Sequence, residues 1–593
     1  MLKLPTHDRR ARLGPANRSQ IIPLMGVAVA SVLVGLPLLQ PRLMQGHDTL
    51  AYLPRYVDFY EGLRHGEIFP RWAANLAFGF GEPTFNFNPP LIYYLVSGFH
   101  SVGFDFSTAE NLSSLLLLLL SGLGMYVLAG EFLGRRAGFI SAIGYLFAPY
   151  VLTTLYVRHA MADFAAFAFM PTALWGLAAH ARDGRCGCLL VGAVSIALVL
   201  LSSLSVMVMI LPALILMGAW QAWTQMRWTA LGRSALCVAL GVALVAFFLA
   251  PALLETRYVH IERRAERLDF RDHFLSVGQV FSTSWGYGLS VRGPHDGMGF
   301  GLGLGHLVLM GVGILLLRRI GRGSPEAARP AVFFLVLLMF SLGMTLEMSR
   351  GVWERVDALG PLQFPWRFLS LAALCSGFLC GVPVVWLEQA SPRQAPWWVL
   401  LFGMGLLAAN IGRARPQGYL SIPLGDFALE RIASKGIPAT QREFEPIWVL
   451  RFPTGPPHEP LTFVRADGRI LNQWVSPAVR DFVVTVGAPT SARASTFYFP
   501  GWTVYVDGVE QPVRASVPDG LMEFDLVAGQ HFVKLVFAAT PARLWGRRVS
   551  LLAGLGTVIA MSICLARATQ HTAPSGQPRP EAARAPDMDE LGA

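Results

Sequence analysis

The sequence predicts an α-helical polytopic membrane protein with about twelve transmembrane helices and a small β-sandwich domain outside the membrane. The first observation is composition. The chain of 593 residues is 53% hydrophobic and 15% charged, with a mean hydropathy of +0.46, whereas about a quarter of the residues of a soluble protein are charged. The second is a series of apolar runs of span length. The third is a change, between residues 445 and 538, to short β-branched and aromatic runs typical of strands.

Apolar runs of about 17–25 residues are long enough to cross the hydrocarbon core of a bilayer. The predicted spans are residues 21–39, 110–130, 138–156, 164–180, 187–201, 206–221, 234–252, 303–318, 331–346, 367–386, 397–411 and 548–566. Because their number is even, both termini lie on the same side of the membrane. The N-terminal tail and first apolar run look superficially like a signal peptide. No small-residue cleavage pattern precedes Gln40, which predicts an uncleaved first span.

Positive charge in the short connections predicts the orientation. Cytoplasmic loops carry an excess of lysine and arginine, and the N-terminal tail and the even-numbered connections do so, for example at Arg135 and Arg136. Both termini are therefore predicted to be cytoplasmic. The segments predicted to lie outside are 40–109, 253–302, 347–366 and 412–547. The loop 253–302 also carries arginines, but acidic residues accompany them, and long loops cross largely regardless of charge.

Residues 412–547 are predicted to contain the β-sandwich. Runs such as DFVVTV, WTVYVDG and HFVKLVF are bounded by turn signals, including Asp507-Gly508 and Asp519-Gly520. The predicted division of the chain is a cytoplasmic tail at 1–20, a transmembrane domain at 21–411 that includes the outer loops 40–109 and 253–302, the outer β-sandwich domain at 412–547, a last transmembrane helix at 548–566 and a disordered cytoplasmic tail at 567–593.

Charge and cysteine use argue against two other classes of protein. The formal net charge is +10, but no polar domain carries a basic patch interleaved with aromatic residues, so a nucleic-acid partner is not expected. The chain has 6 cysteines, and all lie in or beside hydrophobic segments. A disulfide framework in the exported domain is therefore not expected.

The first outer loop, residues 40–109, is the most informative stretch. A connection between two spans is usually short, whereas this one is long, aromatic and charged, and long loops without a domain of their own are usually functional. Its charged and histidine residues include His47, Asp48, Arg55, Asp58, Glu61, Arg64, Arg71 and Glu82. We expect this loop to form the wall of an active site at the outer membrane surface.

Several phrases, taken in their order along the chain, resemble a known family. They are GHD at 46–48, FNFNPPLIYYL at 85–95, FLGRRAG at 132–138, QFPWRF at 363–368 and FYFPGWTVYVDG at 497–508. They resemble the YfhO-like bacterial membrane proteins, including those described as 6-pyruvoyl-tetrahydropterin synthase-related. More broadly, the layout resembles the GT-C glycosyltransferase superfamily. Pterin synthase activity itself is not expected, because that soluble fold needs a compact zinc site of histidines and the 13 histidines here are scattered.

The GT-C resemblance implies a glycosyltransferase of the bacterial inner membrane. Its donor would be a polyprenyl-phosphate-linked sugar, and its acceptor a glycan, lipid or protein outside the cytoplasm. Members of the superfamily carry an acidic residue after the first span, and Asp48 matches it. A carboxylate there can take the proton of an acceptor hydroxyl as a general base, with inversion at the sugar. The alternative is that Asp48 only caps the helix beginning at Thr49.

The donor phosphate needs positive charge, for which arginine is well suited. Arg158 and His159, in the short outer connection YVRHAMAD, are candidates for binding it, as is the pair Trp366-Arg367 at the start of the tenth predicted span. The alternative for these arginines is snorkelling to the membrane interface.

The remaining candidates are predicted to contact sugar or acceptor, and they are His47, Arg55, Arg71, Asn86, Asn88 and Asp163. For Asp163 the alternative is a structural pair with Arg158. For Arg55 and Arg71 it is a pair with a carboxylate of the same loop. No cofactor is predicted, and no acidic pair facing the predicted site indicates a divalent metal.

Two rival functions come from other classes. A flippase or transporter of lipid-linked sugars should place ionisable groups near the bilayer midplane, whereas the predicted spans here are nearly free of charge. The second rival is a non-enzymatic assembly protein of the cell envelope that keeps the same fold.

Overall fold

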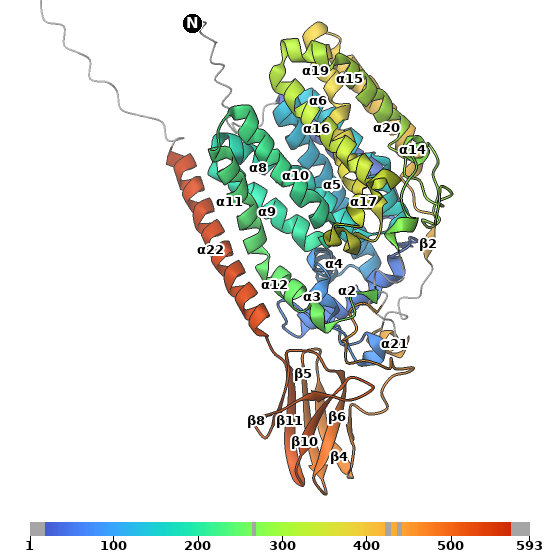
Figure 1. The fold of residues 1–593 in the computed structure, drawn as a ribbon, viewed down its shortest axis with the longest axis vertical. Coiled ribbons are helices and arrows are strands. Elements are labelled where there is room, and N and C mark those ends of the chain that lie inside the picture. The colour runs from blue at the N-terminus through green and yellow to red at the C-terminus, as the bar shows by residue number, and fades with distance from the viewer. Residues whose placement is uncertain (1–17, 264–268, 421–427, 436–441, 466, 571–593) are drawn as a thin grey trace, which may run out of the picture.

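The computed structural model describes residues 18–263, 269–420, 428–435, 442–465 and 467–570. Its helices form an elongated bundle, and a group of strands lies beyond one end of it (Figure 1). The short helices of the first outer loop lie between the bundle and the strands. This arrangement is the predicted one: a mostly helical protein with a small C-terminal β-domain.

The N-terminal part contains one apolar helix and then short elements of the first outer loop. These are α1 (Arg18–Val34), η1 (Leu36–Leu39), β1 (Leu43–Met44), α2 (Thr49–Arg64), η2 (Ala77–Gly79), α3 (Thr84–Phe87) and α4 (Leu91–Ser101). The first apolar helix is shorter than the predicted span 21–39. Gly35 and Pro37 follow Val34, and proline lacks the N–H that a regular helix needs.

The bundle is built from the helices that follow. They are α5 (Phe106–Leu133), α6 (Arg135–Leu146), α7 (Pro149–Leu152), the π-helical turn η3 (Thr153–Arg158), α8 (Met161–Asp183), α9 (Cys186–Ser202), α10 (Leu204–Gln225), α11 (Thr229–Leu244), α12 (Ala246–Leu254), α15 (Leu304–Gly323), α16 (Pro325–Thr345), α18 (Leu369–Cys380), α19 (Val382–Ala390) and α20 (Ala395–Asn410). The shorter elements between them are η4 (Thr256–Tyr258), η5 (Phe270–Asp272), α14 (Val277–Phe281), η6 (Glu347–Ser349), α17 (Arg350–Trp353), η7 (Asp357–Leu362), η8 (Pro365–Phe368) and η9 (Ile411–Arg413).

Local sequence explains why α5 begins and ends where it does. The Asp105 carboxylate accepts hydrogen bonds from the backbone N–H groups of Ser107 and Thr108, at 3.0 and 3.1 Å, and so satisfies donors that the first helical turn leaves free. At the other end Gly134 adopts a φ of 93°, which favours glycine.

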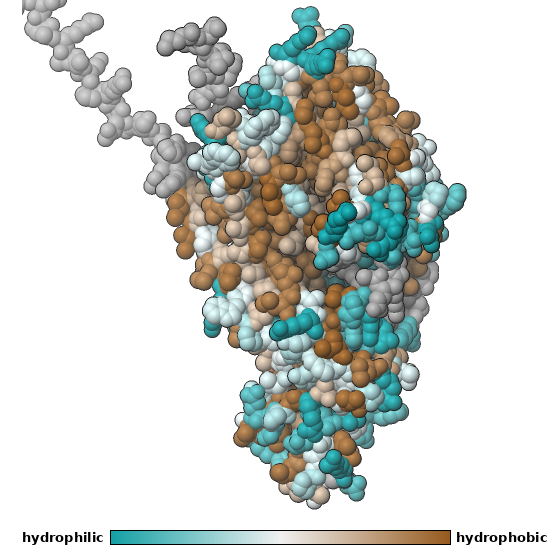
Figure 2. Space-filling model, in the orientation of Figure 1, coloured by the Kyte–Doolittle hydropathy of each residue, from teal (hydrophilic) through white to brown (hydrophobic). Residues whose placement is uncertain are grey.

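Among the described residues, eight helices are long and apolar enough to cross a membrane, or up to 10 if each of two bent pairs is one span. The bent pairs are Arg135–Leu146 with Pro149–Arg158, at 43°, and Thr229–Leu244 with Ala246–Leu254, at 76°. Two of the predicted spans fall on shorter apolar helices, Ile21–Val34 and Cys186–Ser202. Every predicted span thus falls on a helix or a bent pair. Figure 2 shows that hydrophobic residues cover most of the visible face of the bundle.

The segments predicted to lie outside the membrane meet at one end of the bundle. β1 pairs with β2 (Tyr419–Leu420) in an antiparallel arrangement, and an isolated bridge joins Val259 to Pro446. The loop 253–302 carries arginines although it is predicted to lie outside, and at least one of them is paired with a carboxylate at this end. Arg263 forms an ion pair with Glu445 at 2.7 Å.

The C-terminal domain contains two antiparallel sheets. One has the strand order β3-β6-β10-β9 and the other β4-β5-β11-β7-β8. The strands are β3 (Leu461–Phe463), β4 (Gly468–Val475), β5 (Val479–Val486), β6 (Thr490–Phe497), β7 (Trp502–Val506), β8 (Val509–Gln511), β9 (Arg514–Ala515), β10 (Leu521–Leu526) and β11 (Gly529–Phe537). Alternate residues of β5 are buried, as expected for a sheet with one face against a core. The predicted turn Asp507-Gly508 joins β7 to β8 with positive φ at both residues.

Two further helices flank the β-domain in sequence. The short α21 (Leu429–Lys435) lies near η2 and α2, and the long α22 (Pro541–Gln570) runs from the β-domain along α12, α11 and α9.

Candidate active site

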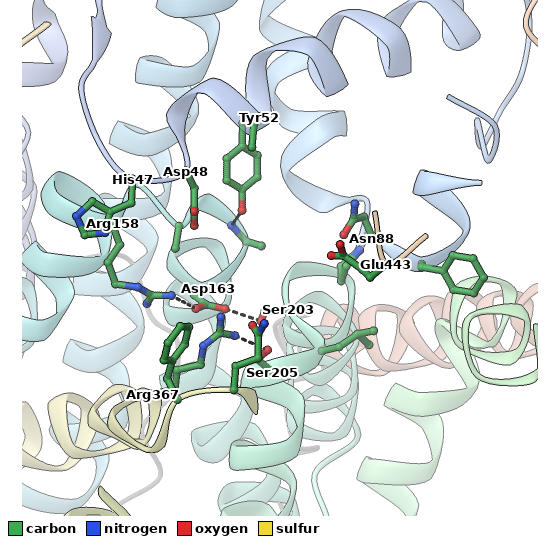
Figure 3. A pocket seen from close by; sticks show the side chains of 18 of the residues that line it. His47, Asp48, Tyr52, Asn88, Arg158, Asp163, Ser203, Ser205, Arg367 and Glu443 are labelled. Atoms are coloured by element: carbon green, nitrogen blue, oxygen red, sulfur yellow. Dashed lines mark hydrogen bonds and ion pairs between the residues drawn. The ribbon is translucent and has the colours of Figure 1, made fainter. Parts of the chain in front are cut away.

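A cavity of about 490 Å³ lies where the first outer loop meets the helix bundle. Its lining residues come from the start of α2, residues 87–89, the turn 158–163, the α9–α10 junction at 203–205, the region 252–261, the loop 289–298, and residues 363–367 and 443–444. The predicted site residues that line it are His47, Asp48, Arg55, Asn88, Arg158, Asp163, Trp366 and Arg367. The structure therefore brings together residues that lie far apart in the sequence (Figure 3).

Asp48 stands at the N-cap position of α2, but its side chain makes no capping hydrogen bond. The hydroxyl of Thr49 bonds the local backbone instead: it accepts from the Gly46 N–H at 3.0 Å and donates to the Met44 carbonyl at 2.9 Å. Within the part of the chain that the structure describes, the Asp48 carboxylate has no hydrogen-bond partner, and it lines the cavity. Capping alone thus does not account for this side chain.

Backbone hydrogen bonds tie Asp48 to the turn that carries Arg158. The N–H of Asp48 donates to the Arg158 carbonyl at 3.0 Å, and the N–H of His47 donates to the Val157 carbonyl at 3.1 Å. A Cβ atom on Gly46 would lie 2.5 Å from the Cβ of His159, so only glycine permits this close approach. The His47 ring faces the Tyr287 carbonyl with its Nε2 at 3.0 Å.

The turn itself has an unusual backbone. Residues 153–158 form a π-helical turn, and His159 follows in the left-handed region with a φ of 54°. Both features are enriched at functional sites. The conformation directs the buried His159 ring away from the cavity, where its Nε2 lies 3.0 Å from the Glu110 carboxylate. His159 was predicted to bind the donor phosphate; the structure places it in the wall behind the site.

Arg158 is held from three sides. Its guanidinium donates to Asp163 at 3.0 Å and to the Tyr150 hydroxyl at 3.2 Å, and it lies 4.8 Å from the centre of the Trp366 ring. The structure thus shows the ion pair that was the structural alternative for Asp163. The other Asp163 oxygen accepts from the Ser203 hydroxyl at 2.7 Å.

Arg367 lies at the same end of the cavity. Its guanidinium donates to the Ser205 hydroxyl at 2.6 Å, while its buried Nε has no partner among the described residues. Figure 3 shows the Arg158, Asp163 and Arg367 side chains close together. Asp48 lies on the side of the Arg158–Asp163 pair that is away from Arg367, and Tyr52 lies beside Asp48. Asp163 pairs with Arg158, whereas the Arg367 guanidinium donates to a hydroxyl, so this end offers arginine donors to a phosphate.

Arg55 and Asn88 also line the cavity, together with Glu443 from the segment that precedes the β-domain. Arg55 is only 5% exposed. In Figure 3 Asn88 and Glu443 lie across the cavity from the two arginines.

Some lining residues were not predicted from the sequence. They are Tyr52, Ser203, Ser205 and Glu443. The Tyr52 hydroxyl accepts from the Ala162 N–H at 3.1 Å, and burial raises the pKa of this tyrosine well above its usual value. The serines lie in the SSLS run between two predicted spans, where a polar break in an apolar stretch was a usable signal. Glu443 lies in a segment with no such signal.

Arg71 and Asn86 were predicted to contact substrate, but they do not line the cavity. Arg71 donates to the Asn86 side chain at 2.9 Å and to the Phe247 carbonyl at 2.7 Å. Asn86 in turn donates to Glu255 at 2.8 Å. Their polar groups are therefore committed to joining the first loop to α12. Burial lowers the pKa of Arg71 to about 9.

The arrangement combines two chemical capabilities. A carboxylate that makes no hydrogen bond to the described residues can accept a proton from a hydroxyl in the cavity, and the arginines beside it can stabilise an anionic group. Across the described residues, no group of three or more His, Cys, Asp and Glu side chains is placed to hold a metal ion.

The chain is similar to several solved structures, among them three proteins of known name. The arabinofuranosyltransferase AftD from Mycobacteria matches with 19% identity and a TM-score of 0.41, over 69% of this chain and 28% of that one. The Archaeoglobus fulgidus oligosaccharyltransferase matches with 12% identity and a TM-score of 0.43, over 72% and 60%. ArnT from Cupriavidus metallidurans, bound to undecaprenyl phosphate, matches with 15% identity and a TM-score of 0.32, over 66% and 64%. The chain spans less than two thirds of each of these proteins.

No curated protein matches the chain. A family model does match, over residues 85–420, and its description is a 6-pyruvoyl-tetrahydropterin synthase related domain, membrane protein. The match includes Asn88, Arg158, Asp163 and Arg367 of the cavity and begins after Asp48. It covers more than half of the chain. The protein is therefore a multi-pass membrane protein that belongs to the 6-pyruvoyl-tetrahydropterin synthase related family.

Proposed function

We propose that the protein is a glycosyltransferase of GT-C type in the bacterial inner membrane, with both termini in the cytoplasm. It transfers a sugar from a polyprenyl-phosphate donor to a hydroxyl of an acceptor outside the cytoplasm. The observation that carries the proposal is the Asp48 carboxylate, which has no hydrogen-bond partner among the described residues and lines the same cavity as Arg158 and Arg367.

The reaction needs few groups. The Asp48 carboxylate takes the proton of the acceptor hydroxyl, and the oxygen forms a bond to the anomeric carbon of the donor sugar. The bond from that carbon to the phosphate oxygen breaks, and the electron pair leaves with the polyprenyl phosphate, so the configuration inverts. Because the leaving group is already a stable anion, no general acid is required. Arg158 and Arg367 stabilise its charge.

The location of the charged groups favours this function over transport. A transporter is expected to bind its cargo near the bilayer midplane, at broken helices. Here the charged residues of the cavity lie at helix ends and in connections on the side of the β-domain. The site therefore suits chemistry at the membrane surface.

The test uses purified protein in lipid, incubated with polyprenyl-phosphate hexoses and pentoses, and mass spectrometry of the released polyprenyl phosphate. We expect release by the wild-type protein and at least a hundredfold less by Asp48→Asn, in line with the roughly 10²–10⁴-fold effect of a general base.

Thermal unfolding provides the control for this variant. Because Asp48 makes no capping bond, Asp48→Asn should leave the midpoint of unfolding nearly unchanged. Full release by a well-folded Asp48→Asn protein would rule out the base. No release from any donor, with a cell-envelope glycan still missing in a deletion strain, would favour transport or assembly instead.

A further inference from the structure

We propose that the end of the cavity formed by Arg55, Asn88 and Glu443 binds a neutral sugar unit of the acceptor through two neighbouring hydroxyl groups. The inference rests on the proposed function and names the acceptor class for the same cavity. It follows from the hydrogen-bonding groups that this end presents.

The first observation is a set of donors without partners. Arg55 is 5% exposed, and its Nε and Nη2 make no hydrogen bond with any described residue. The side-chain nitrogen of Asn88 is buried and likewise without a partner in the described chain. An unsatisfied buried donor is destabilising, so such donors are rarely retained without a ligand to accept from them.

The second observation is an acceptor beside these donors. Glu443 is 4% exposed and lines the same cavity. Figure 3 shows its carboxylate next to the Asn88 side chain, and it is near enough to Arg55 for their charges to interact. An ionised carboxylate only accepts hydrogen bonds, whereas arginine only donates them. A ligand that fits both must donate and accept at neighbouring atoms.

A pair of sugar hydroxyls meets this requirement, because each hydroxyl can donate once and accept as well. An anionic group would accept from Arg55 and Asn88 but would be repelled by Glu443. A cationic group would be repelled by Arg55. The mixed set of groups therefore selects a neutral polyol.

Aromatic residues supply the apolar part of this end. Phe87 and Phe444 both line the cavity, and their rings stack with centroids 5.4 Å apart and planes 14° apart. Ligand sites of this kind combine an apolar wall with a few placed polar groups. Phe444 and Glu443 come from the segment between the bundle and the β-domain, so that segment takes part in acceptor recognition.

The test measures binding without any lipid donor, so that it is independent of catalysis. Wild-type protein in nanodiscs is titrated with methyl glycosides of neutral hexoses, with methyl glucuronide and with glucose 6-phosphate, followed by saturation-transfer NMR. We expect the neutral glycosides to bind, and about tenfold weaker binding in Glu443→Gln and in Asn88→Ala. Glu510→Gln and Asn472→Ala, at exposed positions of the β-domain, are the matched controls and should bind as the wild type does.

Three results would overturn the inference: equal binding by the site variants and the controls, tighter binding of glucuronide or glucose 6-phosphate than of the neutral glycosides, or no saturation transfer to any probe. Thermal unfolding of each variant shows that it is folded. Asp48→Asn should keep glycoside binding while losing release of polyprenyl phosphate. A failure of this inference is thus distinguishable from a failure of the proposed function.

Discussion

Two carboxyl groups of the first outer loop are surrounded so as to favour their neutral forms. Burial raises the pKa of Asp58 to about 7, even though Asn75 donates hydrogen bonds to both of its oxygens. Burial also raises the pKa of Glu67 to about 7, and the nearby Asp58 adds to the effect. A group whose pKa is higher in the folded chain binds its proton more tightly there. Between about pH 4, where such groups titrate in an unfolded chain, and pH 7, stability therefore falls as pH rises.

We expect the unfolding midpoint of the purified protein to decrease across this pH window. The double variant Asp58→Asn, Glu67→Gln removes both titrating groups and should have a shallower decrease, measured as the midpoint at several pH values between about 4.5 and 7.5. An identical slope in the wild type and the double variant would show that these carboxyls do not set the pH dependence.

At the residue scale, the sequence allowed some site residues to be predicted and concealed others. Asp48 was predicted from its match to the acidic residue of the GT-C resemblance, and Arg158 and Arg367 from their positive charge in or beside short connections predicted to lie outside. The left-handed backbone of His159 and its close approach to Gly46 were not predictable, because Gly46 lies far away in the chain. Glu443 was not predictable either, because only the folded chain brings it to the cavity.

At the scale of elements, the break between α11 and α12 has a specific partner on α22. The Ser550 hydroxyl accepts from the Phe247 N–H at 2.8 Å and donates to the Ala243 carbonyl at 3.1 Å. A bend of 76° at this point removes regular helical hydrogen bonds, and a neighbouring hydroxyl replaces part of what is lost. The last helix thus stabilises the bent pair.

We therefore expect Ser550→Ala to destabilise the protein by about 1–2 kcal/mol, since a hydroxyl that bridges two helices in a membrane contributes about this much. The measurement is thermal unfolding in detergent or lipid. Ser562→Ala on the same helix is the matched control, because that exposed hydroxyl donates only to the Val558 carbonyl one turn earlier. Equal midpoints for the two variants would contradict a bridging role for Ser550.

Apolar runs predicted where the helices lie but not how they break. The predicted span 234–252 is the bent pair α11 and α12. The bend was not predicted, because an apolar run indicates burial in lipid but does not reveal that Ser550 of another helix bonds the backbone at the break. The β-domain was predicted well, since alternation and turn residues are local signals. Its attachment to the bundle was not, because that attachment uses single polar residues dispersed along the chain.

At the scale of the whole molecule, a buried ion pair joins the end of α12 to the start of α22, where the chain leaves the β-domain. Glu255, at the end of α12, accepts from Arg543 at 2.9 Å, and both side chains are 3% exposed. Glu255 also accepts from Asn86 of the first loop, and Arg543 donates to the Pro500 carbonyl at 3.0 Å. The pair therefore connects three parts of the chain beside the cavity wall.

Removal of one partner should leave the other buried without compensation, at a cost of about 3–5 kcal/mol. We expect Glu255→Ala to lower the unfolding midpoint strongly and to make the β-domain more sensitive to limited proteolysis. The double variant Glu255→Gln, Arg543→Met, which leaves no buried charge, should recover much of the loss. Glu347→Ala breaks only the exposed pair with Arg350 and should change stability by no more than about 1 kcal/mol. If Glu255→Ala behaved like Glu347→Ala, the β-domain would be held mainly by aromatic packing, in which Trp72 of the first loop contacts Trp502 and Phe537.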